Sequence, residues 1–114
     1  MKRNVAVAYI RIGKLEQNHI LSSHMTQVEQ IYKYCLENNI VLKEIYNDVG
    51  ESTGGDSKTF YKMMFETLQD KNIDYLIVMS RDRLTRKHSE YVSLSEQLKT
   101  HEKSILDVKE MITK

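Results

Sequence analysis

The chain has no proline and no tryptophan, and only one cysteine and four glycines among its 114 residues. The single cysteine, Cys35, excludes a disulfide within the chain and a multi-cysteine zinc site, so its simplest interpretation is a small buried hydrophobe. This cysteine usage is typical of a cytoplasmic protein, and we expect that location. Without proline, glycine is the main turn residue, and it occurs at Gly13 and in the cluster Gly50, Gly54 and Gly55.

Long hydrophobic runs are also missing. The uncharged stretches 5–10 and 75–80 are too short to cross a bilayer, and the apolar run after Lys2 and Arg3 is too short for a signal peptide. We therefore expect no membrane partner. The length fits one domain, residues 1–114, and excludes a two-domain enzyme.

A strong net charge is absent as well. Seventeen Lys and Arg residues oppose 16 Asp and Glu residues, which gives a net charge of +1. This balance does not by itself indicate a nucleic-acid partner, but a sum over the chain conceals any local basic surface. The hydrophobic fraction of 40% and the charged fraction of 29% are typical of a globular domain rather than a disordered one.

Apolar runs and amphipathic segments alternate along the chain. The runs, which predict strands, cover residues 5–10, 40–46, 73–79 and 104–106. Residues 107–114 are expected to form a helical turn or a frayed tail. Strands that alternate with helices predict an α/β three-layer fold, with a mainly parallel sheet of four or five strands and helices on both faces.

Three segments have apolar residues at spacings of three and four, which indicates amphipathic helices. Ser22 or Ser23 is expected to cap the first helix, and Asp56 or Ser57 the second. The expected buried positions are Met25, Val28, Ile31, Tyr32, Cys35 and Leu36 in the first, Phe60, Met63, Met64 and Leu68 in the second, and Tyr91, Leu94 and Leu98 in the third.

Ligands of open parallel sheets bind beyond the carboxyl ends of the strands. Three predicted loops, 11–17, 47–57 and 80–87, leave those ends and bring several arginines to one edge. Because one guanidinium group can donate two parallel hydrogen bonds to two oxygens of a phosphate, this edge is a candidate anion site. Its charged residues are Arg11, Asp48, Arg81, Asp82, Arg83 and Arg86.

Two short sequence motifs resemble motifs of a known protein family. Tyr9-Ile10-Arg11-Ile12-Gly13 resembles the Tyr-x-Arg-Val-Ser opening of the serine recombinases, the resolvase and invertase family. Asp82-Arg83-Leu84-Thr85-Arg86 resembles the Asp-Arg-Leu-Ser/Gly-Arg signature of that family. Tyr46-Asn47-Asp48 is similar to the end of its second strand, and Gln17 and Gln27 stand where it commonly has glutamines. The resemblance extends from about Val5 to Asp107 and implies a resolvase-like fold. In the family a long dimerisation helix and a separate C-terminal DNA-binding domain follow the fourth strand, and we expect neither within residues 1–114.

The resemblance also implies a function. Domains of this family cut and rejoin DNA without a metal or another cofactor, through a serine that attacks a backbone phosphodiester. Arg11, Arg83 and Arg86 would contact the scissile phosphate and stabilise the charge of its transition state. Asp82 would orient an arginine, and Gln17, Gln27 and Asp48 would be supporting polar groups.

Two positions depart from the family pattern. The nucleophile position is Gly13, which has no side chain that can attack phosphorus. A further family arginine aligns with Ser57, where the neighbouring Lys58 supplies charge without the paired guanidinium donors. The sequence therefore predicts a recombinase-like domain that does not cut DNA, either a regulatory partner of active recombinase subunits or a relic of a mobile element.

Two alternatives remain open at this point. The domain is active if its native residue 13 is serine or if another hydroxyl attacks, with Ser52 and Ser80 nearest the predicted edge. The second alternative is a small α/β domain that binds a phosphorylated ligand, with Gly13 making room for the phosphate. Expected partners of the recombinase-like domain are the DNA backbone, bound weakly and without sequence preference, and further recombinase subunits in a homo- or hetero-oligomer.

A metal site is not expected. The four histidines have no metal-ligand spacing and no second cysteine beside them, so surface positions are the simpler interpretation. They are His19, His24, His88 and His101.

Overall fold

The computed structural model describes residues 4–12, 20–49 and 57–112. The strands of these ranges form one parallel sheet in the order β2-β1-β3-β4. The strands are β1 (Asn4–Ile12), β2 (Ile40–Val49), β3 (Tyr75–Val78) and β4 (Ser104–Asp107). This confirms the predicted α/β class and the parallel sheet.

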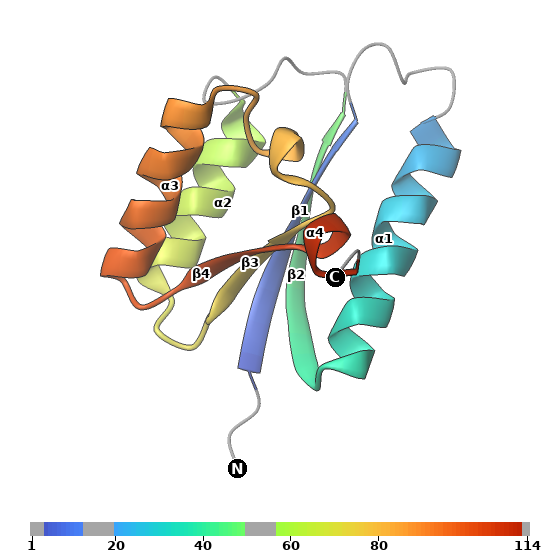
Figure 1. Ribbon diagram of the computed structural model, residues 1–114, viewed down its shortest axis with the longest axis horizontal. Coiled ribbons are helices and arrows are strands. Elements are labelled where there is room, and N and C mark those ends of the chain that lie inside the picture. Colours follow the sequence, from blue (N-terminus) through green and yellow to red (C-terminus); the bar gives the residue numbers. More distant parts are fainter. Residues whose placement is uncertain (1–3, 13–19, 50–56, 113–114) are drawn as a thin grey trace.

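Helices cover both faces of the sheet (Figure 1). Helix α1 (Ile20–Glu37) and the short α4 (Val108–Ile112) lie on one face, and α2 (Lys58–Gln69) and α3 (His88–Thr100) lie on the other. A single 3₁₀ turn, η2 (Arg81–Arg83), follows β3. Residues 108–112 thus take the helical alternative that the sequence left open.

The central strand β1 separates two hydrophobic cores. Its residues Ala6, Ala8 and Ile10 pack with Ile31 and Cys35 of α1 and with Val108 of α4. The alternate residues Val7 and Tyr9 pack under α2 and α3, with Phe60, Met63 and Leu98 among others. The unbroken apolar run in the sequence arises because both faces of β1 are buried.

The first helix differs from its prediction. It begins at Ile20, so Ser22 and Ser23 lie inside the helix and neither is its N-cap. Met25, Tyr32 and Leu36 were expected in the core but are 51%, 52% and 74% exposed. Because α1 packs over β1 and β2 with a narrow stripe of residues spaced by four (Gln27, Ile31 and Cys35), the flanking apolar positions face outward.

The strands β1 and β2 continue beyond their predicted ends. They run to Ile12 and Val49, so Arg11 and Asp48 lie within strands and are direct Cα partners across the β1–β2 pair. Strand β3 is shorter than the apolar run 73–79. The predicted cap Ser57 is confirmed, since its Oγ accepts the Phe60 amide N–H at 3.2 Å.

Candidate phosphate-binding edge

The carboxyl ends of β1, β2 and β3 meet at one edge, which is the upper edge in Figure 1. Arg11 comes from the end of β1 and Asp48 from the end of β2, while η2 supplies Asp82 and Arg83 after β3. The described residues of the three predicted loops therefore converge at this edge.

Arg11 and Arg83 hold β1 and η2 together by reciprocal hydrogen bonds. The Arg11 guanidinium donates from Nε to the Arg83 carbonyl at 3.2 Å and from Nη2 to the Asp82 carbonyl at 3.0 Å. In return, Nη1 of Arg83 donates to the Arg11 carbonyl at 2.8 Å. Gln27 of α1 donates to the same carbonyl at 3.3 Å. The turn η2 is thus fixed to the end of β1.

The Arg11 guanidinium is buried and lies close to a second guanidinium, that of Arg83. Its side chain is 3% exposed, and burial, followed by the charge of Arg83, lowers the pKa of its guanidinium. Its two hydrogen-bond acceptors are neutral carbonyls, which do not cancel that charge. An anion placed beside the two guanidiniums would therefore be bound favourably.

Asp48 joins three elements on the α2 side of this edge. One of its oxygens, Oδ2, accepts the Tyr9 hydroxyl at 2.6 Å and also accepts the hydroxyl of Ser57, the N-cap of α2. All three side chains are buried. The sequence did not predict that Tyr9 donates to Asp48. The feature that could have indicated it is the position of Tyr9, two residues before Arg11 and therefore on the same face of the strand.

Tyr9 keeps its proton more firmly in the folded chain than an exposed tyrosine does. Burial, then the hydrogen bond to Asp48, raises the pKa of its phenol well above the usual value of 10.0. Above about pH 10 the unfolded chain loses this proton while the folded chain retains it, so folding stability falls as pH rises, by up to about 1.4 kcal/mol per pH unit.

We expect Tyr9→Phe to remove that contribution. Urea unfolding measured from pH 9 to pH 11 should show a wild-type stability that falls more steeply with pH than that of the variant, by about 1 kcal/mol per pH unit. Tyr32→Phe, at a half-exposed position on α1, is the matched control and should keep the wild-type slope. Equal slopes for Tyr9→Phe and wild type would contradict the buried phenol.

Asp82 contacts Arg11 through its main chain rather than its side chain. Its carboxylate instead accepts the hydroxyl of Ser80, and this bond, with the charges of Arg83 and Arg11, lowers the pKa of the carboxyl. The Ser80 hydroxyl, one of the two alternative nucleophiles, is therefore hydrogen-bonded to a carboxylate. The expected role of the Asp82 side chain in orienting an arginine stays a prediction.

The remaining predicted residues differ in exposure. Arg83 is half-buried, whereas Arg86 and Lys58 are exposed, and no hydrogen bond joins the Arg86 guanidinium to another of the residues described. Gly13, Gln17 and Ser52 lie outside the described residues. Arg86 is thus open to solvent at this edge, and solvent reaches Arg83 in part.

Neither a metal cluster nor a membrane span occurs in the described ranges. No group of three or more His, Cys, Asp and Glu side chains at residues 4–12, 20–49 and 57–112 is arranged to hold a metal ion. Within those same ranges, no helix is both long enough and apolar enough to cross a bilayer.

Comparison with known proteins identifies the fold and the family. Residues 6–114 match the family model described as Resolvase, N-terminal domain. A search among curated proteins found no matching sequence.

Solved structures share the fold. The N-terminal catalytic domain of TP901-1 integrase has a TM-score of 0.79 at 17% identity, over 94% of this chain and 78% of that one. A resolvase family site-specific recombinase from Streptococcus pneumoniae gives 0.80 at 18% identity, over 95% and 74%. The C-terminal catalytic domain of ISC1926 TnpA, an IS607-like serine recombinase, gives 0.74 at 24% identity, over 92% and 70%.

Proposed function

The chain belongs to the resolvase family of serine recombinases, and from this membership we propose that it binds the DNA backbone at the Arg11–Arg83 edge without cutting it. The observation that carries the proposal is the pair Arg11 and Arg83, each hydrogen-bonded to the other's main chain at the carboxyl edge, in a sequence in which position 13 is glycine. Such an edge attracts a phosphate, whereas glycine supplies no nucleophile.

In this proposal the three arginines have different roles. Arg11 is buried and fixes η2, so that Arg83 and Arg86 contact phosphate oxygens. Gln27 of α1 donates to the Arg11 carbonyl, and Asp48 of β2 holds β1 through the Tyr9 hydroxyl. Ser57 stands where the family has another arginine, and its hydroxyl is used by Asp48 and the first turn of α2.

The biological role that follows is that of a non-cutting partner. A subunit that keeps the fold and the phosphate contacts can join recombinase subunits on DNA while contributing no strand cleavage. Binding is expected to be weak and without sequence preference, since contacts to phosphates carry no base information.

Salt dependence tests the DNA contact. Each phosphate neutralised on duplex DNA contributes about −0.9 to the slope of log K against log salt, so contacts to about two phosphates predict a slope at least as steep as −1.8. Affinity for a short duplex should then fall roughly tenfold or more between about 50 and 200 mM salt. Fluorescence anisotropy measures this directly.

Arg86→Gln should make that slope shallower by about 0.9. Lys71→Gln removes the same charge from an exposed residue before β3, at the opposite edge of the sheet, and should leave the slope unchanged. Salt-independent binding, or equal slopes for the two variants, would rule out this phosphate contact.

A second candidate function has one observation in its favour. A cavity of about 430 Å³ lies beyond the end of β3, and its lining includes Ser80, Arg83 and Lys109. A phosphorylated small molecule would fit such a site. Thermal-shift measurements with nucleotides and with duplex DNA separate the two functions, since stabilisation by nucleotides alone would favour the second.

A further inference from the structure

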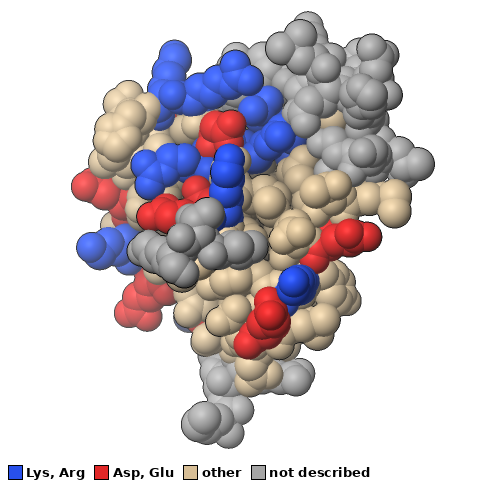
Figure 2. Space-filling view, turned by 45° about the vertical axis from the view of Figure 1, so that its right-hand side comes forward, with Lys and Arg blue, Asp and Glu red and all other residues tan. Residues whose placement is uncertain are grey.

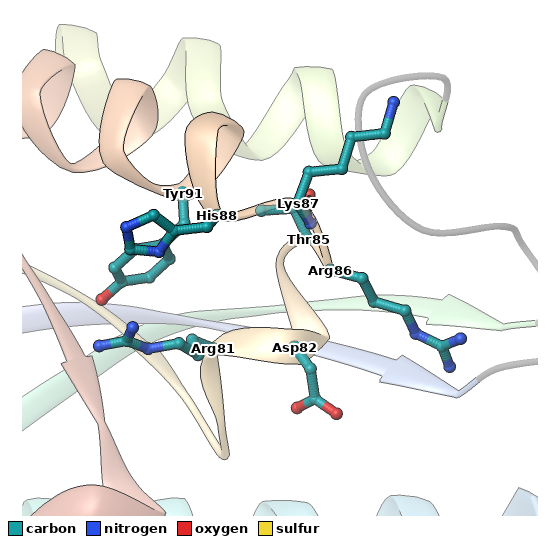
Figure 3. Close-up of a pocket in the computed structure, with 7 residues that line it drawn as sticks. All are labelled: Arg81, Asp82, Thr85, Arg86, Lys87, His88 and Tyr91. Atoms are coloured by element: carbon teal, nitrogen blue, oxygen red, sulfur yellow. Dashed lines mark hydrogen bonds between the residues drawn. The ribbon is translucent and has the colours of Figure 1, made fainter.

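A second group of cations lies beside η2 and shares Arg86 with the edge described above. It surrounds a cavity of about 350 Å³ between η2 and the first turn of α3 (Figure 3). The cavity is lined by Arg81, Asp82, Thr85, Arg86, Lys87, His88 and Tyr91. Arg81 and Arg86 extend in opposite directions in this view, Arg81 toward Tyr91 and His88 and Arg86 toward the end of β1.

Arg81 is anchored in place on the α3 side. Its guanidinium carbon lies 4.5 Å from the centre of the Tyr91 ring, and its backbone N–H donates to Asp107 at 2.9 Å. Nη2 lies 3.8 Å from Oε2 of Glu110, but both of these side chains are about half exposed, so this pair is weak. The guanidinium is therefore oriented by an aromatic ring and remains accessible to an anion.

Positive charge predominates in the cavity lining. Among the lining residues, Arg81, Arg86 and Lys87 carry positive charge and Asp82 carries negative charge, while Glu110 lies beside Arg81 outside this lining. The Asp82 carboxylate is hydrogen-bonded to Ser80. Lys87 is also the N-cap of α3 and gives that helix no side-chain hydrogen bond. Figure 2 shows lysine and arginine side chains gathered over the upper part of the molecule, at the level of the carboxyl edge.

We propose that this cavity holds a second phosphate of the same DNA backbone, with Arg81 as its ligand and Lys87 as a further positive charge at the same cavity. The inference rests on the proposed function and extends it from the Arg83–Arg86 contact to the next part of the strand. A single small anion would occupy one side of η2. A chain of regularly spaced phosphates can occupy both sides, and Arg86, which lines the cavity while extending toward β1, lies between them.

The salt slope of duplex binding tests the second phosphate. In Arg81→Gln/Lys87→Gln, the slope of log K against log salt should become shallower by about 0.9, the contribution of one phosphate. The control Lys71→Gln/Lys99→Gln removes the same charge from exposed residues at the opposite edge and should keep the wild-type slope. Arg81→Lys, which keeps the charge, should keep most of the slope.

Two further measurements make the result independent of folding. Lys87→Gln alone leaves Arg81 on Tyr91 and should still lower the slope, and the ring resonances of His88 should shift when duplex DNA is added to the wild-type chain. Slopes of both Gln variants equal to that of the control would overturn the second phosphate while leaving the proposed function intact. A wild-type chain that does not bind duplex DNA would overturn both.

Discussion

Asp48→Ala is expected to lower the free energy of unfolding by about 3 kcal/mol, because two buried hydroxyl donors lose their acceptor at once. The Tyr9 hydroxyl and the Ser57 hydroxyl both donate to Asp48, and all three side chains are nearly inaccessible to solvent. A buried donor without a partner costs about 1–3 kcal/mol, so the two together account for the expected loss.

Urea unfolding of three variants checks this. Glu44→Ala removes an exposed carboxylate from the same strand and should change stability by less than about 0.5 kcal/mol. Combining Asp48→Ala with Tyr9→Phe should cost less than the sum of the two single changes, by about 1 kcal/mol, because they remove the same hydrogen bond. An Asp48→Ala variant as stable as Glu44→Ala would show that this carboxylate does not hold the three elements together.

The same network explains where sequence reasoning stops. The apolar runs predicted the sheet correctly. Because β1 is buried on both faces, consecutive residues such as Val7 and Ala8 are apolar. The end of that strand was not visible in the pattern, because Arg11 is polar. Its place in β1 depends on carbonyls of Asp82 and Arg83, which are more than seventy positions away.

Two other misses have related causes. Met25 and Leu36 satisfied the helical spacing, but which apolar positions are buried depends on how much of the sheet α1 covers. Lys103 is 4% exposed, a rare position for lysine, since its Nζ donates to the carbonyls of Asp70 and Ile73 at 2.6 and 2.8 Å. Tertiary partners decide both cases, and no local pattern contains them.

Gly13→Ser is expected to produce a covalent protein–DNA adduct that the wild-type chain does not form. Loss of a serine nucleophile lowers a rate by roughly a million-fold in enzymes that depend on one, which places cleavage by the glycine form below detection. The arginines that would stabilise the attacked phosphate are present, with Arg11 and Arg83 already hydrogen-bonded to each other's main chain. Because Ser57 replaces a family arginine, the adduct should form slowly.

A second variant identifies the attacking hydroxyl. Gly13→Ser/Ser80→Ala should form the adduct as Gly13→Ser does, since Ser80 donates to Asp82 and takes no part in the attack. An adduct lost with Ser80 would make that residue the nucleophile instead.

The most direct test of the account is incubation of the wild-type chain with a nicked duplex that traps a covalent intermediate, followed by denaturing electrophoresis. We predict no adduct with the wild-type chain, beside an adduct with Gly13→Ser. An adduct formed by the wild-type chain would contradict the account, and absence of the adduct from both chains would show that serine at residue 13 is not sufficient for cleavage.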